Sequence, residues 1–340
     1  MALKARFQPY TLHFKETAIT SRQHMDVKYT YILHLWDDAS PDVIGTGECN
    51  LFAGLSAEDS PDYSNILQKA CDNPDIPLPQ LSSIRFGFES ARWSLEAKGS
   101  QKMIDTPFSR GEEAITINGL VWMGDKRTML RRMREKIYSG FRCVKLKIGG
   151  IDFQEELSIL DTLRKEFTVE DIELRLDANG AFSPDIAMER LERLSRYNIH
   201  SIEQPIRAGQ WQEMARLCEH SPIPIALDEE LIGFSSDASK EMLLDTVQPQ
   251  YIILKPALCG GFAEADRWIS MAKKRNIGWW ATSALESNIG LNAIAQWVAR
   301  YRPTIPQGLG TGLLYTDNFP STLRLDGDKM WFDTLQDNKW

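Results

Sequence analysis

The fold is decided by IELRLDANG at residues 172–180, HSIEQP at 200–205 and IPIALDE at 223–229. Each run is short and apolar, is bounded by polar residues, and is therefore typical of a buried strand. The stretches between them, 183–197 and 210–220, have the periodicity of amphipathic helices. Strands that alternate with helices in this way predict βα units and a parallel sheet.

The same alternation continues on both sides of these runs. Five further strand candidates are ITING at 115–119, CVKLKIG at 143–149, QYIILKP at 250–256, IGWWATS at 277–283 and PQGLGTG at 306–312. Helices are expected between most of them, for example at 154–167 and 262–276. Eight parallel strands at this spacing predict an α/β fold of the (β/α)₈ TIM-barrel type rather than an open sheet.

The chain before about residue 112 has a different pattern, in which β-like runs alternate with polar turns and end in a helix-like segment at 83–98. We interpret it as a smaller α+β domain, whose stretches 17–25 and 50–58 are candidate lid loops. The last residues have strand and turn character and are expected to pack back on this domain. The expected division is an α+β domain at 1–112 with the tail 313–340, and a barrel at 113–312.

Composition restricts the classes of partner. The chain has 39 Lys and Arg against 47 Asp and Glu, so its net charge of −8 repels nucleic-acid backbones and anionic membranes. The five cysteines show neither metal-site spacing nor a disulfide framework, and the start of the chain has no apolar signal segment. We expect a cytoplasmic enzyme with neither a nucleic-acid nor a membrane partner, and a homo-oligomer is left open.

Three carboxylates end consecutive strands of the expected barrel. Asp177, Glu203 and Asp228 are 26 and 25 residues apart, about one βα unit each, and barrel active sites lie at the C-terminal ends of the strands. Converging carboxylates repel one another unless a hard divalent cation takes their oxygens as ligands. We therefore expect Mg²⁺, with Mn²⁺ as a substitute, and the alternative is three separate loop-capping acids. Asn179 and Glu229 lie beside these residues and are expected to orient them.

Two lysines share one face of the strand at 143–149. Side chains alternate along a strand, so Lys145 and Lys147 both point into the barrel. Their repulsion is expected to lower the pKa of at least one, which would give a neutral amine able to take a proton near pH 7. The alternative is a pair of lysines that extend to the barrel end without a chemical role.

A third lysine, Lys255, ends the strand at 250–256 and is expected at the rim across from the first pair. The alternative is a salt bridge to one of the acids. No histidine lies at the C-terminal end of a strand candidate, so a histidine base or a His/Cys metal site is not expected. A cation and a lysine suit the removal of a proton next to a carboxylate, because that step builds negative charge on the carboxylate oxygens. The expected partner is thus a small anionic carboxylate.

With these residues in place, the chain resembles the enolase superfamily, in its muconate-lactonizing-enzyme-like subgroup. The resemblance covers essentially the whole length, through VKLKIG, LDANG, SIEQP, ALDE and ILKP in order, and GTGECNLFAGLS at 45–56 is similar to the family's capping-domain loop. It implies a modified (β/α)₈ barrel with an N-terminal α+β capping domain. It also implies that Lys147 is the base and that Lys255 stabilises an enediolate from the opposite face.

Within that subgroup, TSALESNIG at 282–290 and GLGTGLLYTDN at 308–318 are most similar to the o-succinylbenzoate synthases. Those enzymes dehydrate a cyclohexadiene carboxylate on the route to menaquinone. The resemblance suggests that Ser283, Ser287, Gly310 and Thr311 bind a distal carboxylate, although the two serines could equally cap a helix. The chain has no DxD motif of the kind that dipeptide epimerases carry near this rim, which argues against a dipeptide substrate.

Other activities stay open. The same scaffold hosts N-succinylamino acid racemases, which begin with the same proton abstraction but need both Lys147 and Lys255 as acid and base. A barrel that has lost catalysis and serves as a binding module is a more remote alternative. Arg22, in the first candidate lid, could clamp a carboxylate, but an exposed loop arginine is usually only solvated.

Overall fold

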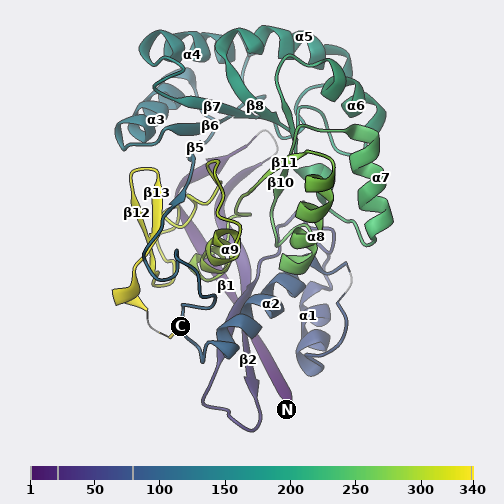
Figure 1. Cartoon of the computed structure of the whole chain (residues 1–340), viewed down its shortest axis with the longest axis vertical. Coiled ribbons are helices and arrows are strands. Elements are labelled where there is room, and N and C mark those ends of the chain that lie inside the picture. Colours follow the sequence, from purple (N-terminus) through teal and green to yellow (C-terminus); the bar gives the residue numbers. More distant parts are fainter. Residues whose placement is uncertain (1, 21–22, 79, 338) are drawn as a thin grey trace.

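A computed structural model describes residues 2–20, 23–78, 80–337 and 339–340. The first part of the chain forms a three-stranded antiparallel sheet and two helices: β1 Leu3–Ile19, β2 His24–Asp37, β3 Gly45–Cys49, α1 Tyr63–Asp72 and α2 Ser82–Glu96. This sheet and its helices occupy the lower part of the molecule in Figure 1. The helix expected at 83–98 is α2, and the α+β character of this part is confirmed.

Close packing of β3 on α2 explains two glycines of the GTGE run. A Cβ atom at Gly47 would lie 2.1 Å from the carbonyl oxygen of Gly87, and one at Gly45 would lie 2.1 Å from that of Ala91. Strand and helix backbones can therefore touch only because these positions lack side chains. The contact fixes the end of β3, from which Glu48 and Asn50 reach the rest of the molecule.

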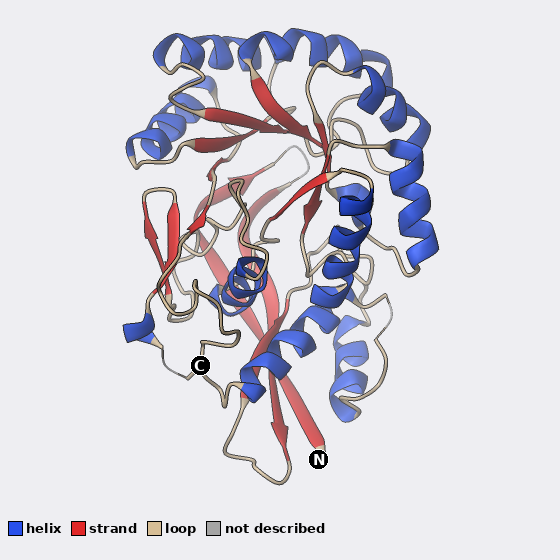
Figure 2. Ribbon diagram, in the orientation of Figure 1, coloured by secondary structure: helices blue, strands red, loops and turns tan. Residues whose placement is uncertain are grey.

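The larger part of the chain is a parallel sheet wrapped by helices. Its strands, in spatial order, are β11 Gly278–Ala281, β10 Tyr251–Leu254, β9 Ile225–Leu227, β8 Ile199–Glu203, β7 Glu173–Asp177, β6 Cys143–Lys147 and β5 Gly119–Val121. The helices are α3 Lys126–Tyr138, α4 Phe153–Glu166, α5 Pro184–Leu194, α6 Trp211–His220, α7 Asp237–Val247, α8 Gly261–Lys274 and α9 Asn288–Ala299. Figure 2 shows most of these helices as an outer layer around the strands.

The expected helices are confirmed to within two residues at each end, except that α5 ends three residues before the predicted end, and their starts have local causes. The stretch expected as one helix at 183–197 is α5 followed by a 3₁₀ turn, Ser195–Tyr197. Pro184 stands in the first turn of α5, where its missing N–H costs nothing. Asp152 precedes α4, and its carboxylate accepts hydrogen bonds from the backbone N–H groups of Gln154 and Glu155.

The first and last expected barrel strands differ from the prediction. In the run 115–119, β4 Ile115–Thr116 pairs with the C-terminal tail, and the parallel sheet begins only at Gly119. The run 306–312 forms isolated parallel bridges, Gln307 with Ile117 and Gly308 with Thr282, instead of a regular strand. These bridges nevertheless connect the two edges of the seven-stranded sheet. A Cβ atom at Gly308 would lie 2.2 Å from Thr282 Oγ1, so the glycine permits this close approach.

Large side chains fill the space inside the curved sheet. Arg175 is 1% exposed, its guanidinium lies 4.5 Å from the ring centroid of Trp280, and its Nη1 donates a hydrogen bond of 2.9 Å to the carbonyl of Pro306. Ala226 and Ile253 pack against Trp280 as well. The sheet thus encloses a packed interior at this end, and its polar site lies at the other end of the strands.

The C-terminal tail crosses between the two parts. Its hairpin is β12 Leu323–Asp326 and β13 Lys329–Phe332, and β13 pairs with β4. Tyr315 forms a bridge with Phe14 of β1, and Lys339 forms one with Ser100. None of the helices in the described ranges has the length and apolar character that crossing a bilayer requires.

Candidate active site

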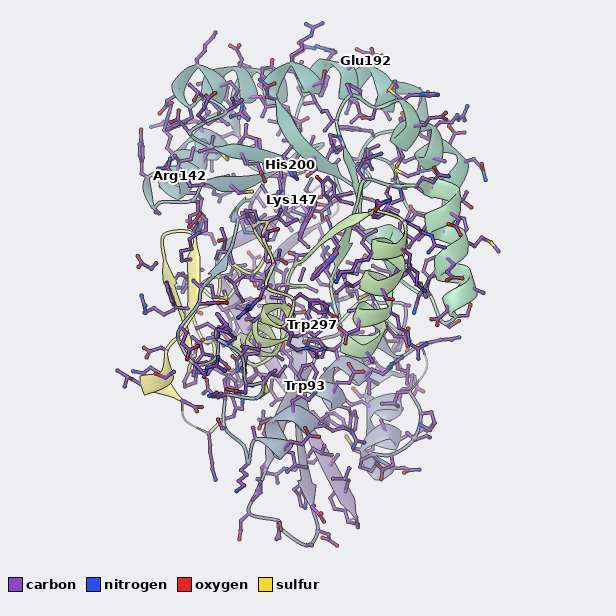
Figure 3. The ribbon with its side chains drawn as sticks, in the orientation of Figure 1. Trp93, Arg142, Lys147, Glu192, His200 and Trp297 are labelled. Atoms are coloured by element: carbon purple, nitrogen blue, oxygen red, sulfur yellow. The ribbon has the colours of Figure 1, made fainter. Side chains whose placement is uncertain are left out.

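The polar residues of the site come from neighbouring strand ends in register. Lys147 of β6 is the ladder partner of Asp177 on β7, which is in turn the partner of Glu203 on β8. Lys145 lies two residues before Lys147 and so shares its face of the sheet. The parallel ladder therefore brings these four side chains to one place, inside the layer of helices, where Lys147 lies in Figure 3.

Ion pairs connect the lysines with the three predicted ligand carboxylates. Lys147 Nζ lies 2.5 Å from Asp177 Oδ2, and Lys145 Nζ lies 2.8 Å from Glu203 Oε2 and 3.3 Å from Asp177 Oδ2. Lys255 is hydrogen-bonded to Asp228 Oδ2, and its Nζ is 3.9 Å from Glu203 Oε1. The structure thus brings together all six residues that the sequence placed at this rim, and the salt-bridge alternative for Lys255 is present in the geometry.

The predicted lowering of the pKa of at least one of the two strand lysines does not apply to Lys145. Burial alone would lower its pKa, but the nearby carboxylates of Glu203 and Asp177 outweigh burial and raise it. The pKa of Lys255 is raised in the same way, by Asp228 and Glu203 against burial. Strand spacing alone could not show this, because the effect depends on the distance from each ammonium to the carboxylates opposite.

The carboxylates respond in opposite directions. Burial would raise the pKa of Asp177, but Lys147, Lys145 and Lys255 together lower it. Burial raises the pKa of Glu203 to about 8, and the negative charge of Asp177 adds to this effect. Without a cation beside it, Glu203 is therefore harder to ionise than Asp177.

The donor set fits a hard divalent cation. Glu203 Oε1 is buried and accepts no hydrogen bond in the described part of the chain, so one carboxylate oxygen is left for another ligand. Asp177, Glu203 and Asp228 offer oxygen donors only, which suit Mg²⁺. Among the described residues, no three acidic, histidine or cysteine side chains form a group that could hold a metal ion as they stand. Lys145 and Lys255 occupy contacts with Glu203 and Asp228 instead.

Asn179 connects the base candidate with a second acid. Its Oδ1 accepts a hydrogen bond of 2.8 Å from Lys147 Nζ, and its Nδ2 donates one of 3.0 Å to Glu229 Oε1. Its backbone has φ +47°, a left-handed conformation that asparagine tolerates better than most residues. Asn179 and Glu229 thus lie beside the acids as predicted, and Asn179 orients Lys147 directly.

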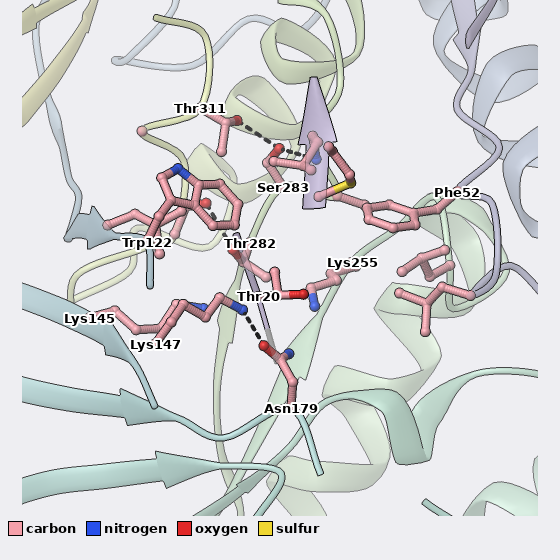
Figure 4. Close-up of a pocket in the computed structure, with 18 of the residues that line it drawn as sticks. Thr20, Phe52, Trp122, Lys145, Lys147, Asn179, Lys255, Thr282, Ser283 and Thr311 are labelled. Carbon is pink, nitrogen blue, oxygen red and sulfur yellow. Dashed lines mark hydrogen bonds between the residues drawn. The ribbon is translucent and has the colours of Figure 1, made fainter. Parts of the chain in front are cut away.

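A cavity lies above the lysines, with an empty volume of about 700 Å³ that includes part of its open mouth. Lys145 and Lys147 face it from one side and Lys255 from the other, as Figure 4 shows. Both expected lid segments contribute to its wall, through Thr20, Gln23, Met25, Phe52 and Leu55. Arg22 lies outside the described residues.

Two wall residues escaped the sequence interpretation. Asn118 and Trp122 flank β5 and line the cavity, although neither ends one of the strands expected from the sequence. The available signal was their position at the end of the first strand candidate, ITING, in which Asn118 is the penultimate residue and which Trp122 follows by three residues. Trp122 supplies a flat apolar surface that suits a ring-shaped substrate.

Three of the four predicted substrate contacts lie at the cavity. Ser283, Gly310 and Thr311 line it, and the Thr311 hydroxyl donates a hydrogen bond of 2.7 Å to Ser283 Oγ. Ser287 is a correction, because it does not line the cavity. It caps α9 by accepting a hydrogen bond from the N–H of Ile289, and its hydroxyl donates to Glu48 Oε2 at 2.6 Å. The helix-capping alternative therefore holds for Ser287.

Comparisons with known proteins agree with this geometry. Residues 128–327 match the enolase C-terminal domain-like family. The chain is 44% identical to the o-succinylbenzoate synthase of Desulfotalea psychrophila, over 93% of this chain and 95% of that protein. The crystal structure of MenC from the same organism has a TM-score of 0.87 and 40% identity, and the match covers 97% of this chain and 100% of that chain.

A dipeptide epimerase from Enterococcus faecalis has a TM-score of 0.84 at 16% identity, covering 98% of this chain and 97% of that chain, which shows a common fold alone. These likenesses, with the parallel sheet and its helices, establish an α/β barrel with a capping domain. The chain therefore belongs to the enolase superfamily, among its o-succinylbenzoate synthases.

Proposed function

We propose that this chain is an o-succinylbenzoate synthase, which removes water from 2-succinyl-6-hydroxy-2,4-cyclohexadiene-1-carboxylate to form o-succinylbenzoate in menaquinone biosynthesis. The observation that carries the proposal is the placing of Lys147 and Lys255 on opposite sides of one cavity, beside Asp177, Glu203 and Asp228. The relative that is 44% identical over most of the chain bears this name.

Asp177, Glu203 and Asp228 would hold Mg²⁺, or Mn²⁺ in its place. When bound, this cation supplies stabilisation of the negative charge that grows on the substrate carboxylate as the α-proton leaves. Lys145 stays charged between Glu203 and Asp177 and holds both carboxylates in position. Its role is thus to orient the acids rather than to transfer a proton.

Lys147 would carry the proton. In its neutral form the amine takes the proton from the carbon next to the carboxylate, and the electron pair of that C–H bond moves into the enediolate. The electron pair of the enediolate then forms the new ring C=C bond as the C–O bond to the hydroxyl group breaks, and Lys147 returns the proton to the departing hydroxyl, which leaves as water. Lys255, whose pKa is raised, remains a cation and stabilises the enediolate from the other side of the cavity.

The distal carboxylate of the succinyl tail would bind to backbone amides. Among the described residues, the N–H groups of Gly310 and Thr311 donate no hydrogen bond to the protein. The hydroxyl of Ser283, in contrast, already donates to Glu286 Oε2 at 2.7 Å. An anionic tail needs hydrogen-bond donors, which the backbone N–H groups of Gly310 and Thr311 supply. Ser283 forms the cavity wall beside them.

The larger organisation is part of the same proposal. The bridges at Gln307 and Gly308 support a closed barrel in which 306–312 stands as the eighth strand. The contacts of the tail with Phe14 and Ser100 support a capping domain at 1–112 joined by 313–340, with the barrel at 113–312. Five free, buried cysteines support a reducing, cytoplasmic location.

One observation favours a second activity, the racemisation of N-succinylamino acids. Both Lys147 and Lys255 reach the cavity, and racemisation requires an acid/base group on each face of the reacting carbon. The relative that is 44% identical over most of the chain is an o-succinylbenzoate synthase, which favours dehydration as the main activity.

The direct test is incubation of the purified protein with Mg²⁺ and the cyclohexadiene substrate, with product identified by NMR. We expect stoichiometric o-succinylbenzoate, and no product after chelation of the cation. Absence of turnover with Mg²⁺ and with Mn²⁺ would overturn the proposal. In parallel, loss of the α-proton signal of N-succinyl substrates in D₂O would reveal racemase chemistry.

A further inference from the structure

A buried chain of polar contacts connects the capping domain with the turn 283–286 beside the cavity. Lys28 is 5% exposed, and Asn50 and Glu286 are fully buried. Lys28 Nζ donates a hydrogen bond of 2.6 Å to Asn50 Oδ1, and Asn50 Nδ2 donates one of 3.0 Å to Glu286 Oε1 and one of 3.0 Å to the carbonyl of Ala284. Lys28, Asn50 and Glu286 do not line the cavity, so they act on it through the turn and through the segment that carries Phe52.

Glu286 holds this turn in an unfavourable shape. Its Oε2 accepts hydrogen bonds of 2.7 Å from the Ser283 hydroxyl and 2.7 Å from the N–H of Ala284. Leu285 has φ +64°, a left-handed conformation that bulky side chains rarely adopt, and it lines the cavity. The Leu285 carbonyl also accepts from the hydroxyl of Tyr315 at 2.8 Å. Such a conformation persists only where surrounding contacts over-determine it.

Glu286 also fixes the direction of two hydroxyl groups. Thr311 donates to Ser283, and Ser283 donates to the Glu286 carboxylate, which can only accept. Both hydroxyl hydrogens are therefore used within the protein. The lone pairs of Thr311 repel an anion, so a distal carboxylate is directed to the backbone amides of Gly310 and Thr311.

We propose that Glu286, with Asn50 and Lys28 behind it, is a positioning residue that sets the selectivity of the cavity for a substrate with a distal carboxylate. This inference rests on the proposed function. It also explains how the capping domain takes part, because Phe52 and Leu55, just after Asn50, form the wall on the other side. The lid segment and the turn are held together by one set of buried contacts.

The test replaces Glu286 with Gln and measures the binding of o-succinylbenzoate and of benzoate by calorimetry with Mg²⁺ present. Gln turns one acceptor into a donor, which then faces the donors of Asn50, Ser283 or Ala284 and stays unpaired. We expect E286Q to bind o-succinylbenzoate about tenfold or more weakly, because such a buried mismatch costs at least one factor of ten. Its affinity for benzoate, which lacks the tail, and for Mg²⁺ should change less than about twofold. A merely structural defect would weaken all three.

Matched variants sharpen the result. Glu48→Gln removes another fully buried carboxylate, which accepts from Ser287 and Gly290 at the start of α9 and contacts neither Ser283 nor Thr311. E48Q should lower stability without changing the preference for o-succinylbenzoate over benzoate. Asn50→Ala provides a second test if E286Q does not fold. It too should lower the preference for o-succinylbenzoate over benzoate. The double variant N50D/E286Q, which returns a carboxylate beside Lys28, should recover part of it.

The outcomes separate the two proposals. If the wild type neither binds o-succinylbenzoate nor turns over the diene, the proposed function fails and this inference fails with it. If the wild type does both, and E286Q and N50A keep the wild-type preference for o-succinylbenzoate over benzoate, this inference alone is overturned.

Discussion

Lys147 on β6 and Asp177 on β7 are partners in the parallel ladder, and Lys147 Nζ lies 2.5 Å from Asp177 Oδ2. The proposed base therefore stands directly beside a proposed metal ligand, held there by backbone register rather than by a mobile loop. Asn179 Oδ1, 2.8 Å from the same ammonium, fixes the second contact. In the proposed mechanism, proton transfer and charge stabilisation would thus act from adjacent strands on the same substrate carbon and its carboxylate.

Replacing Asn179 with Ala should slow turnover because Lys147 loses its orienting acceptor. We expect kcat to fall about tenfold, less than the loss of a proton-transferring group causes. Ala at φ +47° also costs about 1 kcal/mol of backbone strain, whereas Gly does not. N179A and N179G should therefore share the same kcat and differ in unfolding free energy. Wild-type kcat in either variant would contradict the orienting role.

Replacing Glu203 with Gln should weaken Mg²⁺ binding first. Replacing a residue that only orients a metal ligand lowers metal affinity by about 10- to 100-fold, and replacing a ligand itself should lower it at least as much. Calorimetric titration of metal-free protein measures the change, and excess Mn²⁺ should restore part of the turnover. Glu173→Gln, at the opposite end of β7, is the control and should leave Mg²⁺ affinity unchanged. Equal affinities in the two variants would remove Glu203 from the ligand set.

Replacing Lys255 with Arg separates dehydration from racemisation. Arg keeps the positive charge but does not give up a proton near neutral pH. Dehydration needs Lys255 only as a cation, so the loss should be smaller than the roughly hundredfold that removal of an acid/base group causes. Any α-deuterium exchange into N-succinyl substrates that depends on Lys255 should vanish. A variant in which both activities disappear together would show that Lys255 transfers a proton in dehydration too.

Glu89 should make stability depend on pH. It is a residue of α2, and its carboxylate accepts a hydrogen bond from the N–H of Phe262 at the start of α8. Burial raises its pKa to about 7 from 4.5. The pKa of Glu89 is higher in the folded than in the unfolded state. Its contribution to the folding stability is therefore fully present below pH 4.5 and is lost as pH rises to about 7.

Glu89→Gln should therefore be more stable than the wild type at pH 8, by about 1–3 kcal/mol, with the difference shrinking towards pH 5. Denaturant unfolding at the two pH values measures this. Glu96→Gln, an exposed site at the end of the same helix, serves as the control. A stability difference independent of pH would argue against Glu89 as its source.

Strand periodicity was enough to predict the carboxylates and lysines of the site. Residues that end consecutive parallel strands meet at one rim, so Asp177, Glu203 and Asp228 could be grouped from spacing alone. The raised pKa of Lys145 could not be predicted, because it depends on distances across strands. Ser287 could not be assigned either, since capping and substrate binding use the same hydroxyl group.

The contacts between the two parts of the chain could not be predicted from the sequence around the contacting residues. Asn50 and Glu286 are 236 residues apart in sequence, and neither stands at a periodic position that would indicate a partner. The edges of the parallel sheet were also hard to predict, because Gln307 and Gly308 form single bridges with Ile117 and Thr282 rather than a regular strand. Both features are set by tertiary packing, which alternation of apolar and polar residues does not encode.

The central claim is that Lys147 transfers the proton, and replacing it with Ala tests this most directly. Turnover of the cyclohexadiene substrate should be compared between K147A and the wild type at saturating Mg²⁺, with Mg²⁺ affinity and unfolding free energy measured alongside. We expect kcat to fall by about 10²- to 10⁴-fold while Mg²⁺ affinity stays close to that of the wild type. Turnover within about twofold of the wild type, in a folded variant that binds Mg²⁺, would contradict the mechanism.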